Sequence, residues 1–207
     1  MKREQSFNSK ILLFGEYSII QDSMGLTLPY EEFKGKLTFD AKEMNEQFVS
    51  ESNEHLTEFA GYLQRLISEK KLNIHLDIDA FLQDVADGMY FQSSIPQGFG
   101  VGSSGALVAA VYEKYTKEKI DIDNAHSKEV ILALKEIFAK MESFFHGNSS
   151  GVDPLICYLN LPLLIKGKEG IEPVKVELNN DGKGAIFLID TGISRSTEPL
   201  VKYYMQR

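Results

Sequence analysis

Apolar residues along the chain fall into short blocks whose spacing predicts strands. Residues 11–14 form a continuous apolar run that is typical of a buried strand, and residues 17–20 resume as a β-prone segment after Gly15. Residues 73–79 alternate apolar and polar side chains, which predicts a half-solvated strand. Further extended segments are expected at residues 35–40, 91–95, 161–165 and 185–190.

Other blocks repeat their apolar residues at helical spacing. Residues 52–70 place apolar side chains on one face and charges on the other, which predicts an amphipathic helix. Ser127 is a candidate N-cap for a second helix, whose apolar stripe runs over residues 130–145 and which is expected to end at Gly147. With 207 residues and 43% apolar content, the chain can bury the core of one large or two small domains. Strands and helices together predict an α+β fold.

The stretch between these helices, residues 95–110, has the sequence IPQGFGVGSSGALVAA and joins a glycine-rich loop to an apolar segment. Glycine permits positive φ and a close approach of the backbone to a ligand. The first turn of the helix that follows adds unpaired N–H groups and the positive end of the helix dipole, so the loop offers a cradle for an anion, of which phosphate fits best. The spacing is neither that of a Walker A loop nor GxGxxG. An ordinary helix-entry loop is the alternative.

Composition and charge narrow the classes of partner. The net charge of -8 and the lack of a basic stripe argue against a nucleic-acid partner, while ATP remains compatible because loop amides, one lysine and a metal can neutralise it locally. Cys157 is the only cysteine, which excludes a disulfide framework and indicates the cytoplasm. No segment approaches the length of a membrane span, so no membrane partner is expected.

Charged residues at unusual positions are the candidates for chemistry. Lys10 and Glu16 bracket the first predicted strand, where charge is unfavourable unless it is paired or faces a cleft; the alternative is that Lys10 ends an edge strand in solvent. Glu142 lies four residues before His146 on one side of a helix, and a solvated flank is the alternative for this carboxylate. Asp153 precedes a proline and is expected to be extended, either as a proton acceptor or as a turn initiator.

Two of these stretches resemble motifs of the GHMP kinases, the family of galactokinase and of the homoserine, mevalonate and phosphomevalonate kinases. The loop at residues 95–110 resembles their proline-led GLGSSA phosphate loop, with Val101 for the usual leucine and Gly105 for the usual alanine. The sequence KILLFGEY, residues 10–17, resembles the KxxLFGEH stretch of mevalonate kinases, with Tyr17 at the place of the histidine. Tyrosine at this place is more typical of phosphomevalonate kinases.

Two further stretches resemble mevalonate kinases in particular. Residues 142–153 follow the pattern ExxxHGxPSGxD with Ser149 in place of the proline, and this is the most specific signal in the chain. Residues 190–197, DTGISRST, are similar to a DTGxxRST segment that lies near the substrate in that family. The four motifs occur in family order and extend from Lys10 almost to the end of the chain.

The resemblance implies ATP and Mg²⁺ as cofactors and gives a role to each matching residue. Asp153 is implied as the catalytic group that faces the acceptor hydroxyl, and Lys10 as the catalytic group that stabilises charge on the transferred phosphoryl group. Ser104 and Glu142 are implied as ligands of the metal. The implied ATP-binding residues are Gly98, Gly100, Gly102, Ser103, Ser104 and Gly105. The implied substrate-binding residues are Glu16, Tyr17, His146, Arg195 and Thr197.

The resemblance also implies a domain organisation. Residues 1–177 are expected to form an N-terminal ATP-binding domain that resembles ribosomal protein S5 domain 2, and residues 178–207 the beginning of an incomplete, ferredoxin-like C-terminal domain. Family members usually continue for roughly another hundred residues, the size of one further domain. The apolar segment 186–189, where the sheet of that domain would continue, is therefore expected to be exposed, which leaves a homodimer open.

The implied function is ATP-dependent phosphorylation of mevalonate to 5-phosphomevalonate in isoprenoid biosynthesis. Phosphomevalonate kinase, suggested by Tyr17, or another GHMP small-molecule kinase is the alternative among enzymes. A truncated, non-catalytic nucleotide-binding module is the alternative of another class. ATP binding measured beside ADP release separates this last alternative from the enzymes.

Overall fold

The structure is a computed structural model that describes residues 5–16, 18–42, 44–120, 127–167, 170–176, 188–189, 192 and 202–206. Five strands form one sheet, in which every pair of neighbours is antiparallel. The strands are β1 (Phe7–Phe14), β2 (Met24–Thr38), β3 (Tyr90–Ser93), β4 (Leu163–Lys166) and β5 (Ile171–Pro173). The order is β1-β2-β4-β5, and β3 pairs with the far end of β2.

The central strand is β2, because it pairs with three others. Its first residues pair with β4, its middle residues with β1 and its last residues with β3. The sequence predicted only the last part of this strand, at residues 35–40, because Pro29 and the adjacent Glu31 and Glu32 interrupt the apolar pattern. Pairing with β1, in which Lys10 lies opposite Pro29 and Ser9 opposite Tyr30, keeps the strand extended at the proline, and the local pattern does not contain this contact.

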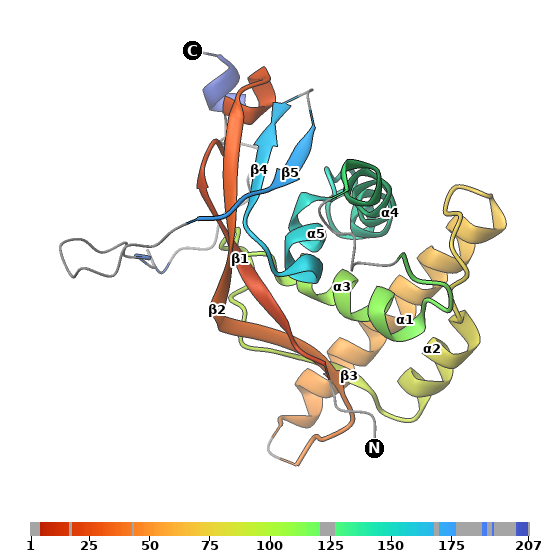
Figure 1. The fold of residues 1–207 in the computed structure, drawn as a ribbon. Helices are drawn as coiled ribbons and strands as arrows, with labels where there is room; N and C mark the ends of the chain where they lie inside the picture. The colour runs from red at the N-terminus through yellow and green to blue at the C-terminus, as the bar shows by residue number, and fades with distance from the viewer. Residues whose placement is uncertain are drawn as a thin grey trace.

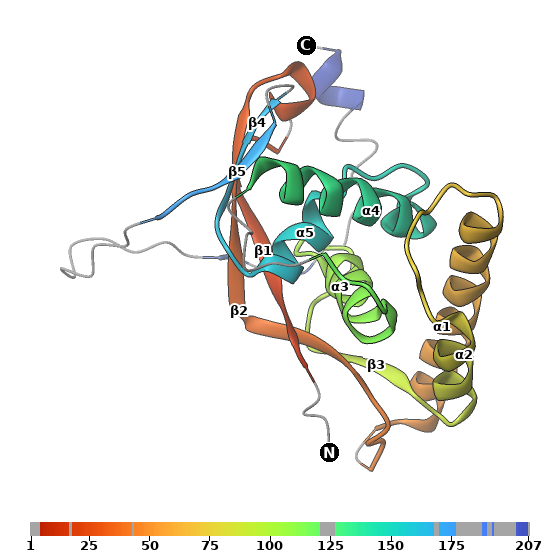
Figure 2. The ribbon, with the colours of Figure 1, turned by 45° about the vertical axis from the view of Figure 1, so that its right-hand side comes forward.

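The helices α1 to α5 lie on one side of the sheet, as both ribbon views show (Figures 1 and 2). They are α1 (Glu46–Ser68), α2 (Ile78–Ala86), α3 (Ser103–Tyr115), α4 (Lys128–His146) and α5 (Val152–Leu159). Helices α3 and α5 contact β1 and β2, whereas α1 and α2 lie farther from these strands (Figure 2). The predicted α+β fold is thus confirmed.

The middle of the core is α3. Its residues from Gly105 to Tyr112 are all buried, as expected for a helix that is apolar on every side. The rings of Tyr112, Phe138 in α4 and Tyr158 in α5 meet edge to face, with centroid distances between 5.1 and 5.4 Å. This packing holds α3 in one orientation and determines where its N-terminus meets the sheet.

The helix predictions are confirmed with shifted ends. The helix predicted at residues 52–70 is α1, which begins earlier, after the N-cap Asn45, whose side chain accepts a hydrogen bond from Gln47 at 2.8 Å. Ser127 is the N-cap residue of α4, and Gly147 ends that helix with a φ of 70°.

One predicted strand, at residues 73–79, is wrong. Within it only Leu76 pairs, in an isolated bridge to Thr116. The side chain of Asp77 accepts a hydrogen bond from the Ala80 N–H at 3.1 Å and so starts α2. The alternating pattern is genuine, but a capping side chain in its middle converts the second half into a helix.

The second β-prone segment, residues 17–20, is also not a strand. Ser18–Gln21 forms a short 3-10 helix, η1, between β1 and β2, and Tyr17 lies outside the described residues. The chain turns here at Gly15, which has a φ of 99° and packs directly on Gly25. A Cβ on Gly15 would lie only 2.6 Å from the Gly25 Cα.

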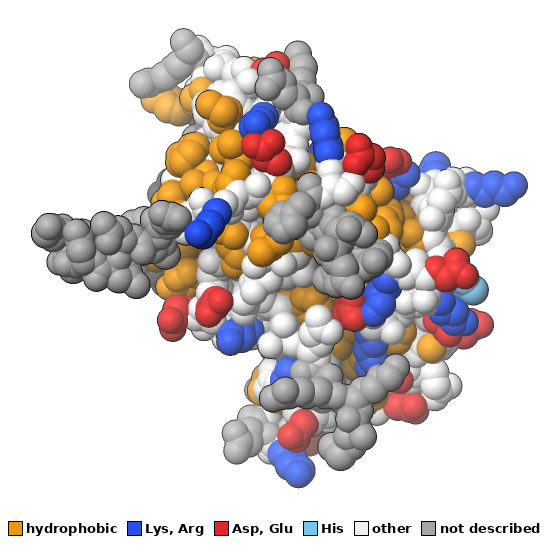
Figure 3. Space-filling model, in the orientation of Figure 1, with side chains coloured by type: hydrophobic (Ala, Val, Ile, Leu, Met, Phe, Trp, Pro, Cys, Tyr) orange, Lys and Arg blue, Asp and Glu red, His pale blue; other side chains and the backbone are white. Residues whose placement is uncertain are grey.

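The second predicted domain falls mainly on residues that the structure does not describe, so the boundary after residue 177 and the ferredoxin-like start stay predictions. Leu188 and Ile189 are exposed, as expected for this apolar segment. Figure 3 shows further apolar side chains over the upper part of the sheet. Phe14, the last residue of β1, and Met24, the first residue of β2, are exposed apolar residues. None of the described helices combines the length and the hydropathy needed to cross a bilayer.

Candidate active site

The glycine-rich loop and the start of α3 form one side of the site. Gly98, Gly100 and Gly102 have φ values of 80°, 71° and 85°, a conformation that L-residues with a side chain rarely adopt. Gly102 is the N-cap residue of α3, which begins at Ser103. The predicted arrangement of a glycine loop that leads into a helix N-terminus is therefore confirmed.

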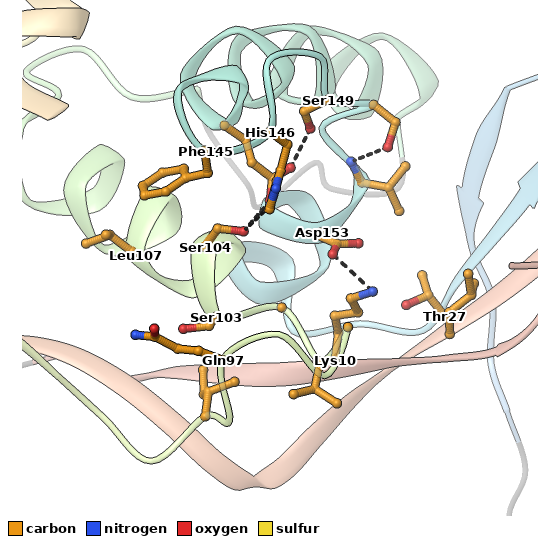
Figure 4. A pocket seen from close by; sticks show the side chains of 18 of the residues that line it. Lys10, Thr27, Gln97, Ser103, Ser104, Leu107, Phe145, His146, Ser149 and Asp153 are labelled. Carbon is orange, nitrogen blue, oxygen red and sulfur yellow. Dashed lines mark hydrogen bonds and ion pairs between the residues drawn. The ribbon is translucent and has the colours of Figure 1, made fainter. Parts of the chain in front are cut away.

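A lysine from β1 lies against this loop. The Lys10 N–H donates to the Val101 carbonyl at 3.0 Å, and a Cβ on Gly102 would lie 2.9 Å from Lys10 Cγ. The Lys10 side chain is 8% exposed, and its Nζ lies 3.0 Å from Oδ2 of Asp153 (Figure 4). The alternative of a lysine that ends an edge strand in solvent is thus wrong.

The charge state of Lys10 follows from this pair. Burial alone would lower its pKa, but the neighbouring Asp153 carboxylate, through its charge and its hydrogen bond, outweighs burial and raises the pKa above the ordinary value. The ammonium form is therefore held at all physiological pH values.

Asp153 is helical, and the expectation that it is extended is wrong. It lies in the first turn of α5, whose N-cap is Gly151, and Pro154 follows it in the same turn. Proline is tolerated there because the N–H that it lacks would have no partner within the helix. The first turn also favours a carboxylate, since the positive end of the helix dipole lies there.

Gly105 allows the two helices to meet. A Cβ at this position would lie 2.8 Å from the carbonyl carbon of Asp153 and 2.9 Å from the nitrogen of Pro154. The backbones of α3 and α5 therefore touch directly, and Gly105, expected to bind ATP, is not among the residues that line the cleft. Its position indicates a packing role that brings Ser104 close to Asp153.

Glu142 forms a second polar cluster on the other side of the first turn of α3. Its side chain is almost completely buried, at 3% exposed. Oε1 accepts a hydrogen bond from Ser104 Oγ at 3.0 Å, and Oε2 accepts one from Ser149. Nε2 of His146 lies 3.1 Å from the same Ser104 hydroxyl, and the two side chains point toward one another (Figure 4). The solvated-flank alternative for Glu142 is therefore wrong.

The environment of Glu142 disfavours its charged form. Burial, followed by the nearby charge of Asp153, raises its pKa to about 7, although hydrogen bonds from two serines act in the opposite direction. Within the described part of the chain, this carboxylate has no ion-pair partner of its own.

These residues fit a magnesium ion in part. Among the described residues, no group of three His, Cys, Asp or Glu side chains is arranged to hold a metal ion. Ser104 and Glu142 nevertheless place a hydroxyl and a buried carboxylate side by side, and Mg²⁺ prefers such hard oxygen ligands and takes its others from water and substrate phosphates. The two residues could therefore hold Mg²⁺ together with a phosphorylated ligand.

One wide cleft of about 2140 Å³ contains both clusters. Ordinary small-ligand pockets occupy roughly 300–1,000 Å³, so the cleft has room for two ligands side by side. Its polar part includes Glu16 and His146, both expected to bind substrate. Apolar side chains line it as well, among them Phe48, Leu56, Phe91, Leu107 and Phe145. Tyr17, Arg195 and Thr197 lie outside the described residues.

The sequence analysis assigned no role to three residues of this region. Ser149 holds Glu142, as described above. Thr27 lines the cleft and donates to the Ile11 carbonyl at 3.1 Å. Cys157 lies 3.8 Å from the Gly102 carbonyl, and burial raises the pKa of its thiol well above the ordinary value. Of these residues only Ser149 gave a sequence signal near the site, because it stands in place of the motif's proline.

Comparison with known proteins agrees with this geometry. Residues 58–160 match the family model of the GHMP kinases N terminal domain. The chain carries a GHMP kinase N-terminal domain. No curated protein matches the chain in sequence. The GHMP domain accounts for the glycine loop, α3, α4 and α5, which all lie within or next to the matched residues.

Two solved structures share the fold. The mevalonate kinase of L. major, in complex with R-mevalonate, has a TM-score of 0.53 and 16% identity, and the similarity covers 100% of this chain and 62% of that one. The Methanococcus jannaschii mevalonate kinase has a TM-score of 0.51 and 17% identity, and the similarity covers 86% of this chain and 57% of that one. The chain therefore spans less than two thirds of either structure, and at these identities the likeness concerns the fold.

Proposed function

We propose that the protein is a small-molecule kinase that transfers the γ-phosphoryl group of ATP to a hydroxyl group. The observation that carries this proposal is the ion pair between Lys10 and Asp153, at 3.0 Å, beside the glycine loop in the cleft. A buried cation and a carboxylate at the N-terminus of a helix are what phosphoryl transfer to an alcohol needs, because positioning and charge neutralisation supply most of the rate.

The nucleotide phosphates would lie at the N-terminus of α3. There the loop with Gly98, Gly100 and Gly102 offers backbone N–H groups, and Ser103 adds a hydroxyl group. The apolar side chains that line the cleft would enclose the uncharged part of the nucleotide. An overall charge of -8 does not oppose this, since the loop amides, the helix dipole and Lys10 act locally.

Asp153 would act as the proton acceptor for the acceptor hydroxyl. The hydroxyl oxygen attacks the γ-phosphorus, its proton passes to the carboxylate, and the bond between that phosphorus and the bridging oxygen breaks to release ADP. The Asp153 side chain is 36% exposed and keeps one oxygen outside its ion pair. The Lys10 ammonium would stabilise negative charge on the transferred group.

Ser104 and Glu142 would hold Mg²⁺ beside the phosphate-binding loop. When bound, the ion would neutralise negative charge on the phosphates. The hydroxyl and the carboxylate are already in contact at 3.0 Å, so the ion would meet a preformed pair of oxygen ligands.

Mevalonate is the acceptor that we propose, with 5-phosphomevalonate as product and isoprenoid synthesis in the cytoplasm as the setting. The motif at residues 142–153 supports it, and the L. major enzyme was solved with R-mevalonate. Glu16 and His146 would contact the acceptor from within the described cleft. Arg195, together with Tyr17 and Thr197, is proposed from the motifs alone. Phosphomevalonate would need more positive charge than Lys10 and Arg195 provide.

The test measures ATP–Mg²⁺ binding by calorimetry beside a coupled ADP-release assay with mevalonate, phosphomevalonate, homoserine and galactose as acceptors. We expect ADP release to be fastest with mevalonate. Faster turnover of another acceptor would support the kinase activity but show that mevalonate is not the preferred substrate. ATP binding without turnover of any acceptor would favour a non-catalytic nucleotide-binding module, and absence of ATP binding would refute the proposal as a whole.

A further inference from the structure

The hydroxyl group of Ser149 lies between Glu142 and the start of α5, the helix that carries Asp153. It donates a hydrogen bond to Oε2 of Glu142 and accepts one from the Gly151 N–H at 3.0 Å. Glu142 belongs to α4, and Gly151 is the N-cap of α5, the helix that carries Asp153. The hydroxyl thus joins the carboxylate at the end of one helix to the first backbone group of the next.

The connection lies in a region with little freedom to rearrange. Gly151 has a φ of 74°, and a Cβ there would lie 2.2 Å from the Lys135 carbonyl oxygen and 2.6 Å from the Ala139 nitrogen. The start of α5 is therefore packed directly on the backbone of α4. A side chain at position 149 meets Glu142 at a distance that this backbone packing sets, so the residue type there decides whether the carboxylate is held.

The residue at position 149 is also where this chain departs from the motif that it otherwise matches. The pattern has proline there, which has no hydroxyl group to donate, whereas this chain has serine. The Glu142 contact therefore depends on a residue that departs from the pattern, and the pattern does not account for it.

We propose that Ser149 is a positioning residue for the metal side of the site. It holds Oε2 of Glu142, so that Oε1 stays beside the Ser104 hydroxyl as a ready pair of oxygen ligands for a divalent cation. The same hydroxyl ties this pair to the helix of Asp153, and so to the acceptor side. This inference rests on the proposed function, since it concerns the cation that accompanies the nucleotide.

The neighbouring serine is a matched control. Ser150 Oγ accepts a hydrogen bond from the Val152 N–H at 3.3 Å, at the same helix start. Its hydroxyl group makes no contact with Glu142. Ser150→Ala therefore removes a similar loop contact and leaves the carboxylate held.

The experiment titrates Mg²⁺ into the full chain at a fixed ATP concentration and follows nucleotide binding by calorimetry. Ser149→Ala should weaken the apparent Mg²⁺ affinity roughly 10-fold or more, as loss of a partner of a metal ligand typically does. Ser149→Thr, which keeps the hydroxyl, should restore affinity to near wild type, and Ser150→Ala should leave it unchanged. Thermal unfolding of each variant without Mg²⁺ shows whether the fold is retained.

These results show whether Ser149 positions Glu142 or only supports the structure of the loop. Equal Mg²⁺ affinity in Ser149→Ala and Ser150→Ala, or no recovery in Ser149→Thr, would overturn the inference. If Ser149→Ala fails to fold, Ser149→Cys, which keeps the volume but donates weakly, is judged by the same criterion. Absence of nucleotide binding in the wild type would instead refute the proposed function, so the two failures are distinguishable.

Discussion

The two sides of the first turn of α3 bury charge in different ways. On one side, Lys10 and Asp153 form an ion pair at 3.0 Å, and each charge compensates the other. On the other side, the carboxylate of Glu142 is 3% exposed and is held by the hydroxyl groups of Ser104 and Ser149, with no cation of its own among the described residues. The first side is balanced within the protein, whereas the second is not.

The difference indicates which side requires a ligand. A buried charge is unfavourable unless a partner compensates it, and a carboxylate that the fold leaves unbalanced is a mark of a functional site. The Lys10 side is complete before any ligand binds, as the proposed role toward an acceptor hydroxyl requires. The Glu142 side is balanced by uptake of a proton or by a cation, which supports the proposed binding of Mg²⁺ there.

The largest expected effect is on the balanced side. Asp153→Asn should lower turnover by roughly 10²–10⁴-fold, because it removes the proton acceptor, while ATP affinity changes little. Steady-state ADP release and calorimetry measure the two quantities. Asp79→Asn, at an exposed position in α2, is the control. Near wild-type turnover in Asp153→Asn would remove this residue from the mechanism.

The unbalanced side should make stability depend on pH near neutrality. The pKa of Glu142 rises from 4.5 to about 7 on folding, so the folded state holds its proton more tightly. As the pH rises from 4.5 to about 7, the free energy of unfolding of the metal-free protein should therefore fall. The expected decrease is a few kcal/mol, at about 1.4 kcal/mol per pKa unit.

Urea unfolding at pH 5 and pH 8 in the presence of a chelator measures this change, and Glu142→Gln should remove it. Lys10 acts in another window: since its pKa is raised above 10.5, its contribution is complete below that pH and is lost above it. If the free energy of unfolding depends on pH near neutrality in the same way in wild type and Glu142→Gln, the raised pKa of Glu142 is contradicted.

A smaller effect is expected on the cation requirement. Glu142→Gln should raise the Mg²⁺ concentration needed for half-maximal activity about 10-fold, because one charged oxygen ligand is lost while waters and phosphates remain. A Mg²⁺ titration of ADP release measures it, with Glu136→Gln, an exposed residue of the same helix, as control. Identical titrations for wild type and Glu142→Gln would show that no metal binds there.

The smallest effect tests how tightly the balanced side is packed. Gly100→Ala should lower the free energy of unfolding by about 1–2 kcal/mol through its positive φ alone, because a Cβ there meets nothing within 4 Å. Gly102→Ala should lower the free energy of unfolding further, because its methyl group would also lie 2.9 Å from Lys10 Cγ. Urea unfolding compares the two variants, and equal losses would mean that Lys10 moves aside freely.

Local patterns predicted much of the fold. The spacing of apolar residues gave α1 and α4, and the glycines followed by an apolar segment gave the loop and α3. Such features depend on residues close in sequence. The prediction failed at two places. Asp77 caps a helix inside an alternating pattern. Pairing with β1, which lies farther away in the sequence, keeps β2 extended across Pro29.

The candidate site divides in the same way. The motifs named Lys10, Ser104, Glu142 and Asp153 as chemically important, and the structure brings all four into one cleft. Ser149 was noticed as a departure from the pattern, but its hydroxyl group gained a meaning only when the fold placed Glu142 beside it.

The sequence by itself determined the parts: a loop of glycines that can adopt positive φ, a helix apolar enough to be buried, and charged residues within motifs. Tertiary structure alone decided that Lys10 pairs with Asp153 while Glu142 stays unpaired. Gly105 lets the backbones of α3 and α5 touch, and this contact sets which charges are compensated. Burial and charge pairing depend on residues far apart in the chain, so only the packed structure assigns them.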